Sequence, residues 1–370
     1  QVTNVSDFIW GGTWNGEAVI PFPPMVIVLL GVGAWIMIGL RFYPILKLGE
    51  AFAGLFKKDP SGKGEISPFA ALSTALSGQV GTGNLAGVAT AITLGGPGAL
   101  FWMWVTALLG MATKYSEVTL AQQYRDVHVD QDGKAWEGSV SGGPMYYMTK
   151  GFKERGLPGG KIFALLFCIF TILGALGGGN MFQAWNVALL TESYFGVPKI
   201  ATGIILALVV GMVIIGGIRR IGTVAGKLVP VMCLLYLIAG IAVLVVKAGE
   251  IPATFALIFQ SAFAPLESQG AFVGGTLGFA FMVGMKRALF SNEAGQGSAP
   301  IAHAAAKTAE PAREGVVGGL GPFIDTICIC TLTAMVILST GTWNRDSIGP
   351  LATEISLAAA GEGDEYIVTT

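Results

Sequence analysis

A run of glycine and polar residues, Ser77-Gly-Gln-Val-Gly-Thr-Gly-Asn84, lies inside an apolar stretch long enough to cross a bilayer. Gly78, Gly81 and Gly83 each lower helix stability by about 1 kcal/mol relative to alanine, so a continuous helix is disfavoured there. Irregular backbone at membrane depth is tolerated only where protein buries it or where it lines a wet cavity. A helix interrupted near the bilayer midplane therefore indicates the binding site of a secondary transporter.

The two halves of this broken helix would present opposite partial charges to the midplane. The inner half ends near Ser77 with carbonyl groups, and the outer half begins near Gly83 with N–H groups. Helix N-termini carry about +0.5 charge and bind carboxylates, whereas C-terminal carbonyls bind cations. The break thus predicts an anion site beside a cation site, which suits an amino acid carboxylate next to Na⁺. The alternative is that the glycines, for example Gly83 and Gly87, only allow close helix contact.

The composition is that of an all-α polytopic membrane protein. Apolar residues make up 53% of the chain and charged residues 12%, whereas soluble domains carry about 25% charge. A net charge of −1 gives no basic surface for nucleic acid. The four cysteines lack metal-site spacing and the two histidines are far apart. We therefore expect no enzyme, no metal site and no cofactor apart from a coupling ion.

The hydropathy pattern predicts one transmembrane domain over residues 1–370, embedded in the lipid bilayer of the cell (inner) membrane. The spans are expected at 21–41, 66–94, 97–123, 161–190, 198–218, 223–247, 270–290 and 315–341. A ninth span would begin near residue 364 and be truncated. Lys and Arg gather in one set of alternate loops, so the positive-inside rule places that set in the cytoplasm and the N-terminus outside.

Further polar residues lie inside the predicted spans. Asn180 and Gln183 are three residues apart and share a helix face, where hydrogen bonding between helices and contact with a ligand are both open. A carboxylate at mid-membrane, such as Asp325, costs at least about 2.5 kcal/mol and needs a partner. Lys114 is one candidate partner. Asp325 could serve in a structural ion pair, as a helix cap, or directly in ion coupling.

Four motifs together resemble one known family, the alanine or glycine:cation symporters (sodium:alanine symporters). The resemblance runs in order along residues 65–340. Its motifs are Ser77-Gly-Gln-Val-Gly-Thr-Gly-Asn-Leu-Ala-Gly-Val88, Ser141-Gly-Gly-Pro-Met-Tyr-Tyr147, Leu289-Phe-Ser-Asn-Glu-Ala-Gly-Gln-Gly-Ser-Ala-Pro300 and Phe323-Ile-Asp-Thr326.

The resemblance implies a leucine-transporter-like fold of two inverted five-helix repeats. Span 21–41 would be an extra N-terminal helix, and the second repeat would be C-terminally incomplete. The implied function is sodium-coupled symport (uptake) of small neutral amino acids, alanine and/or glycine, by alternating access, in a protein that works as a monomer. An uncoupled amino acid carrier or channel is the alternative, and a membrane-embedded enzyme is a further class that the lone histidines disfavour.

The resemblance also implies roles for individual residues. The carbonyls of Ser77 and Val80 would face Na⁺, and a second broken helix is expected around 278–284. A gating or structural polar role is expected for Lys114, Ser291, Asn292, Glu293 and Asp325. The substrate-binding candidates are Gln79, Gly81, Thr82, Gly83, Asn84, Asn180, Gln183, Gly278, Phe279, Phe281 and Gly284.

Overall fold

The computed structural model describes residues 24–57, 59, 61–128, 140–263 and 279–344, and a few positions before residue 20. Gly278 and the expected ninth span lie outside these residues. The described part is an all-α fold. Its helices are α2 (Pro24–Gly39), α3 (Tyr43–Leu46), α4 (Leu48–Phe56), α5 (Pro68–Gln79), α6 (Thr82–Gly95), α7 (Ala99–Tyr124), α8 (Pro144–Glu154), α9 (Gly160–Gly174), η1 (Ala175–Met181), α10 (Phe182–Phe195), α11 (Lys199–Ile214), α12 (Gly217–Val246), η2 (Ala248–Glu250), α13 (Ile251–Phe263), α14 (Phe279–Asn292), α15 (Ser298–Ala304), α16 (Pro311–Pro322), η3 (Phe323–Cys330), α17 (Thr331–Thr340) and η4 (Thr342–Asn344).

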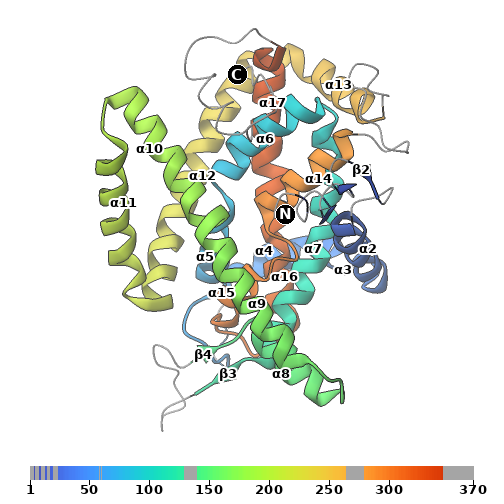
Figure 1. The fold of residues 1–370 in the computed structure, drawn as a ribbon, viewed down its shortest axis with the longest axis vertical. Coiled ribbons are helices and arrows are strands. Elements are labelled where there is room, and N and C mark those ends of the chain that lie inside the picture. Colours follow the sequence, from blue (N-terminus) through green and yellow to red (C-terminus); the bar gives the residue numbers. More distant parts are fainter. Residues whose placement is uncertain are drawn as a thin grey trace.

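Short antiparallel strand pairs lie outside the bundle. Strand β1 (Thr13–Trp14) pairs with β2 (Glu17–Ala18), with Thr13 opposite Ala18. Strand β3 (Asp126–Val127) pairs with β4 (Val140–Ser141), with Asp126 opposite Ser141, beside α8 at one end of the bundle (Figure 1).

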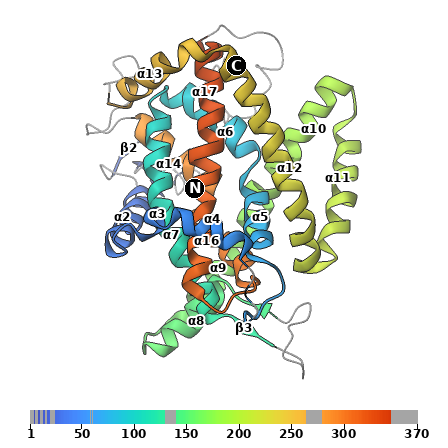
Figure 2. The ribbon, with the colours of Figure 1, turned by 180° about the vertical axis from the view of Figure 1, so that it is seen from behind.

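Helices α16, η3 and α17 form one long central helix with a π-helical segment in its middle. Seen from behind, it runs between α7 on one side and α5 and α12 on the other (Figure 2). Glycines on α16 allow α7 to approach closely, because a Cβ at Gly315 would lie 2.0 Å from Thr119 Oγ1 and one at Gly318 would lie 2.6 Å from Val118 Cγ2. The core is therefore built around this pair of helices.

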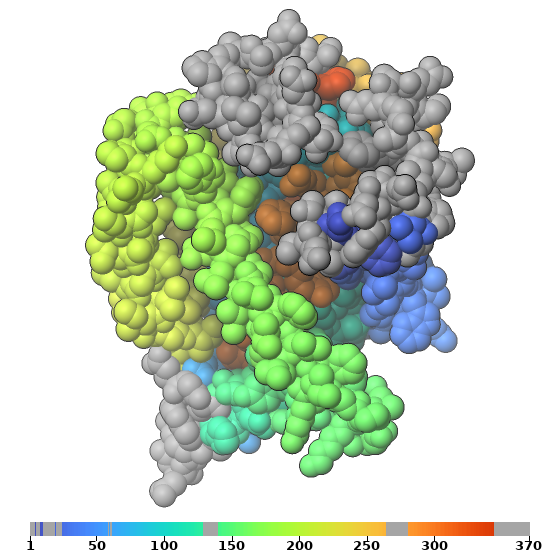
Figure 3. All heavy atoms as spheres, viewed as in Figure 1, coloured from blue at the N-terminus to red at the C-terminus, as the bar shows by residue number. Residues whose placement is uncertain are grey.

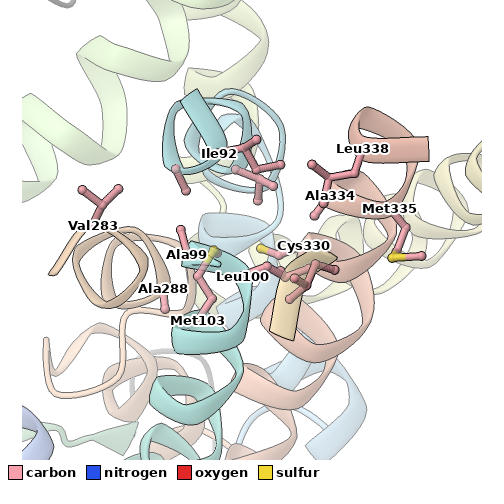
Figure 4. Close-up of a cluster of buried hydrophobic side chains, with 13 residues drawn as sticks. Ile92, Ala99, Leu100, Met103, Val283, Ala288, Cys330, Ala334, Met335 and Leu338 are labelled. Carbon is pink, nitrogen blue, oxygen red and sulfur yellow. The ribbon is translucent and has the colours of Figure 1, made fainter. Parts of the chain in front are cut away.

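Two apolar clusters fill the interior on either side of the central helix. One joins α6, α7, α14 and α17, with Ile92, Leu100, Met103 and Met335 buried in it (Figure 4). The other joins α4, α5, α12 and α16, and Leu320 is fully buried there. Both clusters include a half of the interrupted helix α5–α6, so packing on two sides positions the break.

The outer helices are apolar on their exposed faces. Three helices of the described part, 160–195, 217–246 and 311–340, are long and apolar enough to cross a membrane by length and composition. Helices α9 to α12 form one side of the molecule in the ribbon and the space-filling view (Figures 1 and 3). Phe195 and Ile215 there are 80% and 87% exposed. Apolar side chains are stable in such positions when lipid surrounds them.

The described residues show a break further along the chain than Phe281 and Gly284, where the sequence suggested one. Helix α14 is continuous from Phe279 to Asn292, so it has no interruption at Phe281 or Gly284. The chain turns instead at 293–297, where Glu293, Gly295 and Gly297 have φ of 54°, 88° and 77°. Left-handed backbone is readily adopted by glycine and rarely by other residues, which is why two glycines occur in this turn.

Candidate functional site

Helices α5 and α6 are separated by two residues, Val80 and Gly81. The Gly81 N–H, which a continuous helix would donate to the Ser77 carbonyl, donates instead to Asn84 Oδ1 at 2.8 Å. The Asn84 N–H donates to the Gly81 carbonyl at 3.1 Å in return. This reciprocal cap begins α6 and withdraws one N–H donor from the end of α5, whose carbonyls then face the break.

Gln183 on α10 reaches the first residue of α6. Its Oε1 accepts hydrogen bonds from Thr82 Oγ1 at 2.6 Å and from the Thr82 N–H at 3.4 Å. Asn180, which the sequence paired with Gln183, lies in the π-helical segment η1 and is exposed. The structure thus brings only Gln183 of this pair to the break.

Asp325 in η3 is fully buried and is the centre of a polar cluster. Its Oδ1 accepts from Asn84 Nδ2 at 2.6 Å and from Ser291 Oγ at 3.1 Å, and its Oδ2 accepts from Thr326 Oγ1 at 2.8 Å. Asn292 Nδ2 donates to Thr326 Oγ1 at 3.1 Å. The cluster therefore ties α6 and α14 to the central helix.

Lys114 on α7 is fully buried, and its Nζ has no hydrogen-bond partner among the described residues. The carboxylates that face it are Glu117, Glu293 and Asp325. Lys114 is thus an electrostatic neighbour of Asp325, as the sequence suggested, while the hydrogen bonds to Asp325 come from other residues. Asn84 could not be identified as a partner of Asp325 from sequence, because this contact joins segments 241 residues apart.

Glu293 lies in the turn between α14 and α15. One carboxylate oxygen, Oε2, accepts a hydrogen bond from Ser298 Oγ at the start of α15. Its other oxygen, Oε1, would lie 3.8 Å from a Cβ built on Gly78. Glu293 therefore places a carboxylate against the last turn of α5.

A cavity of about 590 Å³ lies beside the break. Of the predicted substrate residues, Gln79, Gly83 and Gln183 line it. Glu293 also lines it, although the sequence predicted only a gating or structural role for that residue. Its remaining lining residues are Gly78, Phe167, Phe170, Thr171, Gly174, Ala175, Gly178, Gly179, Phe290, Gln296 and Ser298. The sequence did not indicate that the aromatic residues Phe167 and Phe170 of α9 line this cavity, since apolar residues in a membrane helix more often face lipid.

Other predicted site residues lie away from this cavity. Phe281 packs edge-on against Trp102, with ring centroids 4.9 Å apart. A Cβ at Gly284 would lie 2.3 Å from the Ala99 carbonyl oxygen, so this glycine serves the contact of α14 with α7. Phe279 is the first residue of α14.

The oxygen atoms around Asp325 are of the type that binds a hard cation such as Na⁺. One carboxylate and the hydroxyls of Ser291 and Thr326 converge there. Within the described part of the chain, no three or more His, Cys, Asp or Glu residues are grouped to hold a metal ion.

A buried, oxygen-rich cluster and a ligand-sized cavity at the break of a membrane helix define an all-α integral membrane transporter. The chain matches the model of the sodium:alanine symporter family over residues 12–369, and it belongs to that family. Its function class is therefore transport, not enzymatic catalysis.

Several curated relatives are similar over most of their length. The sodium/alanine symporter AgcS of Methanococcus maripaludis is 46% identical over 92% of this chain and 70% of its own. A putative sodium/proton-dependent alanine carrier of Bacillus subtilis is 42% identical over 90% of this chain and 64% of its own. A probable sodium/glutamine symporter of the same organism is 38% identical over 90% and 67%.

Proposed function

We propose that this protein carries a small neutral amino acid, alanine and/or glycine, together with Na⁺ by alternating access. The observation that carries the proposal is the cavity at the α5–α6 break, which faces the carbonyl end of one half-helix and the N–H end of the other. These ends attract a cation and a carboxylate respectively. The names of the relatives, two of them alanine carriers, support this substrate class.

The substrate carboxylate would bind at the start of α6, near Thr82 and Gly83. The coupling ion has two candidate positions. One is the carbonyls of Ser77 and Val80, where α5 ends. The other is the oxygen cluster of Asp325, which is fully buried and would be stabilised by a cation.

Selectivity for a small side chain would depend on the residues next to the break. A volume of 590 Å³ exceeds what one alanine fills, so the whole cavity does not set the size of the substrate. Gly83 lies against Phe290, whose Cδ1 would be 3.7 Å from a Cβ there. This narrow corner admits a methyl group more readily than a long side chain.

The wider architecture is part of the same proposal. We expect two inverted five-helix repeats of the leucine-transporter-like type, with α2 as the extra N-terminal helix. The N-terminus would lie outside the cell membrane and the protein would work as a monomer.

The test is uptake of radiolabelled alanine into proteoliposomes that contain the full-length protein. An inward sodium gradient should raise accumulation, and a proton gradient alone should not. Glycine should compete well, and leucine and glutamine poorly. Accumulation driven only by protons would contradict the coupling ion, and uptake that neither saturates nor responds to either gradient would favour a channel or an uncoupled carrier.

A further inference from the structure

We propose that Glu293 receives the ammonium group of the transported amino acid, opposite the start of α6 that receives its carboxylate. This inference rests on the proposed function and assigns a polarity to the bound substrate. The sequence motif around Glu293 favoured a gating role, but the side chain lines the cavity.

The position of the carboxylate supports this role. Ser298 Oγ donates to Oε2 and so orients the group. Oε1 is directed to the last turn of α5, 3.8 Å from the Cβ position of Gly78. The backbone of Glu293 has φ of 54°, an unfavourable conformation for a residue with a Cβ. Such strain is found at sites where the position of a side chain matters more than local stability.

The electrostatics of the break match a zwitterion in one orientation. The C-terminal carbonyls of α5 carry partial negative charge, and Glu293 adds a full negative charge beside them. The N-terminus of α6 carries partial positive charge two residues further along the chain. An ammonium group is therefore attracted to the Glu293 side, and a carboxylate to the Gly83 side of the same cavity.

Gln79 is a second polar residue beside the cavity. It is the last residue of α5, is 2% exposed and lines the cavity. Both its Oε1 and its Nε2 have no hydrogen-bond partner among the described residues. A buried amide without partners is costly. Both amide atoms are shielded from the cavity and lie beside α16, with Oε1 3.3 Å from the Cβ position of Gly321, so the side chain would have to rotate to meet a substrate.

The neighbouring charges also favour an added cation. Lys114 is buried and interacts electrostatically with three acidic side chains, those of Glu117, Glu293 and Asp325. Lys114 cannot neutralise all of them, and charge in a membrane interior is stable only when it is paired. Na⁺ and the substrate ammonium would each supply a positive charge to this region.

The experiment measures thermal unfolding of the full-length protein in detergent, first with NaCl and then with NaCl and increasing alanine. Glu293→Gln keeps the shape of the side chain and removes its charge. We expect this variant to retain the stabilisation by Na⁺ and to bind alanine about 10- to 100-fold more weakly, as for loss of a hydrogen bond to a charged group. Glu192→Gln, on the exposed side of α10, is the matched control and should bind like the wild type.

Lactate, which has a hydroxyl in place of the ammonium group, separates a local contact from a general defect. In the same thermal unfolding experiment, Glu293→Gln should weaken the binding of alanine and leave the dissociation constant of lactate unchanged. An equal loss for both ligands, a loss of the Na⁺ response, or alanine affinity within twofold of the wild type would each overturn the assignment of Glu293. A wild-type protein without any alanine response would instead overturn the proposed function, and this inference with it.

Discussion

Substitution of Gly83 tests whether the break holds the substrate. Gly83 is buried in the first turn of α6 and lines the cavity. A Cβ there would lie 3.4 Å from Ser291 Cα, 3.5 Å from Ser291 Oγ and 3.7 Å from Phe290 Cδ1. These are ordinary van der Waals contacts, and Gly83 has helical geometry. We therefore expect Gly83→Ala to fold normally and to lose little alanine affinity.

Gly83→Val adds two methyl groups about 1.5 Å beyond that Cβ. Ser291 and Phe290 occupy one side, so at least one methyl group must overlap them or enter the cavity. Overlap with Ser291 or Phe290 would cost about 1–3 kcal/mol of folding stability. A methyl group in the cavity would instead compete with the substrate for space, and we expect alanine affinity to fall about tenfold or more, which is about 1.4 kcal/mol or more. Valine is favourable in a membrane span, so expression and insertion should persist. The assay is alanine-dependent thermal stabilisation, followed by sodium-driven uptake in proteoliposomes.

The control needs a glycine with open space around it. Gly203 on α11 has no neighbour within 4 Å of a built Cβ, so Gly203→Val should transport normally. Gly95, at the end of α6, is unsuitable, because its Cβ would lie 3.1 Å from Ala99 Cβ and 3.2 Å from Val283 Cβ. If Gly83→Val expressed normally and transported alanine at the wild-type rate, the break would be a packing feature. The substrate site would then have to be sought elsewhere on η1, α10 and η3.

Three further changes test the surroundings of the break. Asp325→Asn leaves one acceptor oxygen where three donors converge, so the sodium concentration for half-maximal alanine uptake should rise about tenfold or more. Thr82→Val and Gln183→Ala each remove the 2.6 Å hydrogen bond from Thr82 Oγ1 to Gln183 Oε1. Each should weaken alanine binding by about 1 kcal/mol, and the double variant should bind alanine no more weakly than either single variant. The Ala309 N–H lowers the pKa of Asp59 below its ordinary value of 3.8. The ionised carboxylate therefore stabilises the fold fully above about pH 4 and loses this effect as the pH falls further. Asp59→Asn should lower the melting temperature at pH 7. As the pH drops below 4, the melting temperature of this variant should fall less than that of the wild type.

The first break could be predicted because its cause is local. Closely spaced glycines lower helix stability, and the ends expected near Ser77 and Gly83 lie at Gln79 and Thr82 in the structure. The substrate and sodium roles of the surrounding residues stay predictions, since they depend on a ligand. The sequence could not show the cap itself, in which Asn84 Oδ1 accepts a hydrogen bond from the Gly81 N–H.

The break expected at Phe281 and Gly284 is absent, because a glycine in a membrane helix can either interrupt the helix or allow a neighbouring helix to pack closely. Gly284 suggested an interruption, yet it lets α14 pack against the backbone of α7 at Ala99. The real turn begins at Glu293, a residue whose left-handed backbone no propensity scale predicts. Only the neighbouring helix distinguishes a glycine that breaks a helix from one that packs it.

The partners of Asp325 illustrate a further limit. A carboxylate in a span must be paired, and the sequence indicated this. The choice of partner depends on which helices meet, however, and Asn84 and Asp325 are 241 residues apart. Lys114 was a reasonable candidate by charge, and it does face Asp325. The hydrogen bonds to Asp325 come instead from amide and hydroxyl groups.

Asn84 links the two breaks through a single side chain. Its Oδ1 accepts from Gly81 and begins α6, while its Nδ2 donates to Ser291 on α14 and to Asp325 on η3. Helix α6 cannot move away from α14 without breaking the hydrogen bonds that Asn84 Nδ2 donates. Asp325 would then lose a donor, which is costly for a buried carboxylate. A cation at Asp325 would repay part of that cost. With Na⁺ at Asp325, as proposed, the amide of Asn84 would connect the occupancy of the ion site to the position of α6, which is the connection a symporter requires between its ion and its substrate.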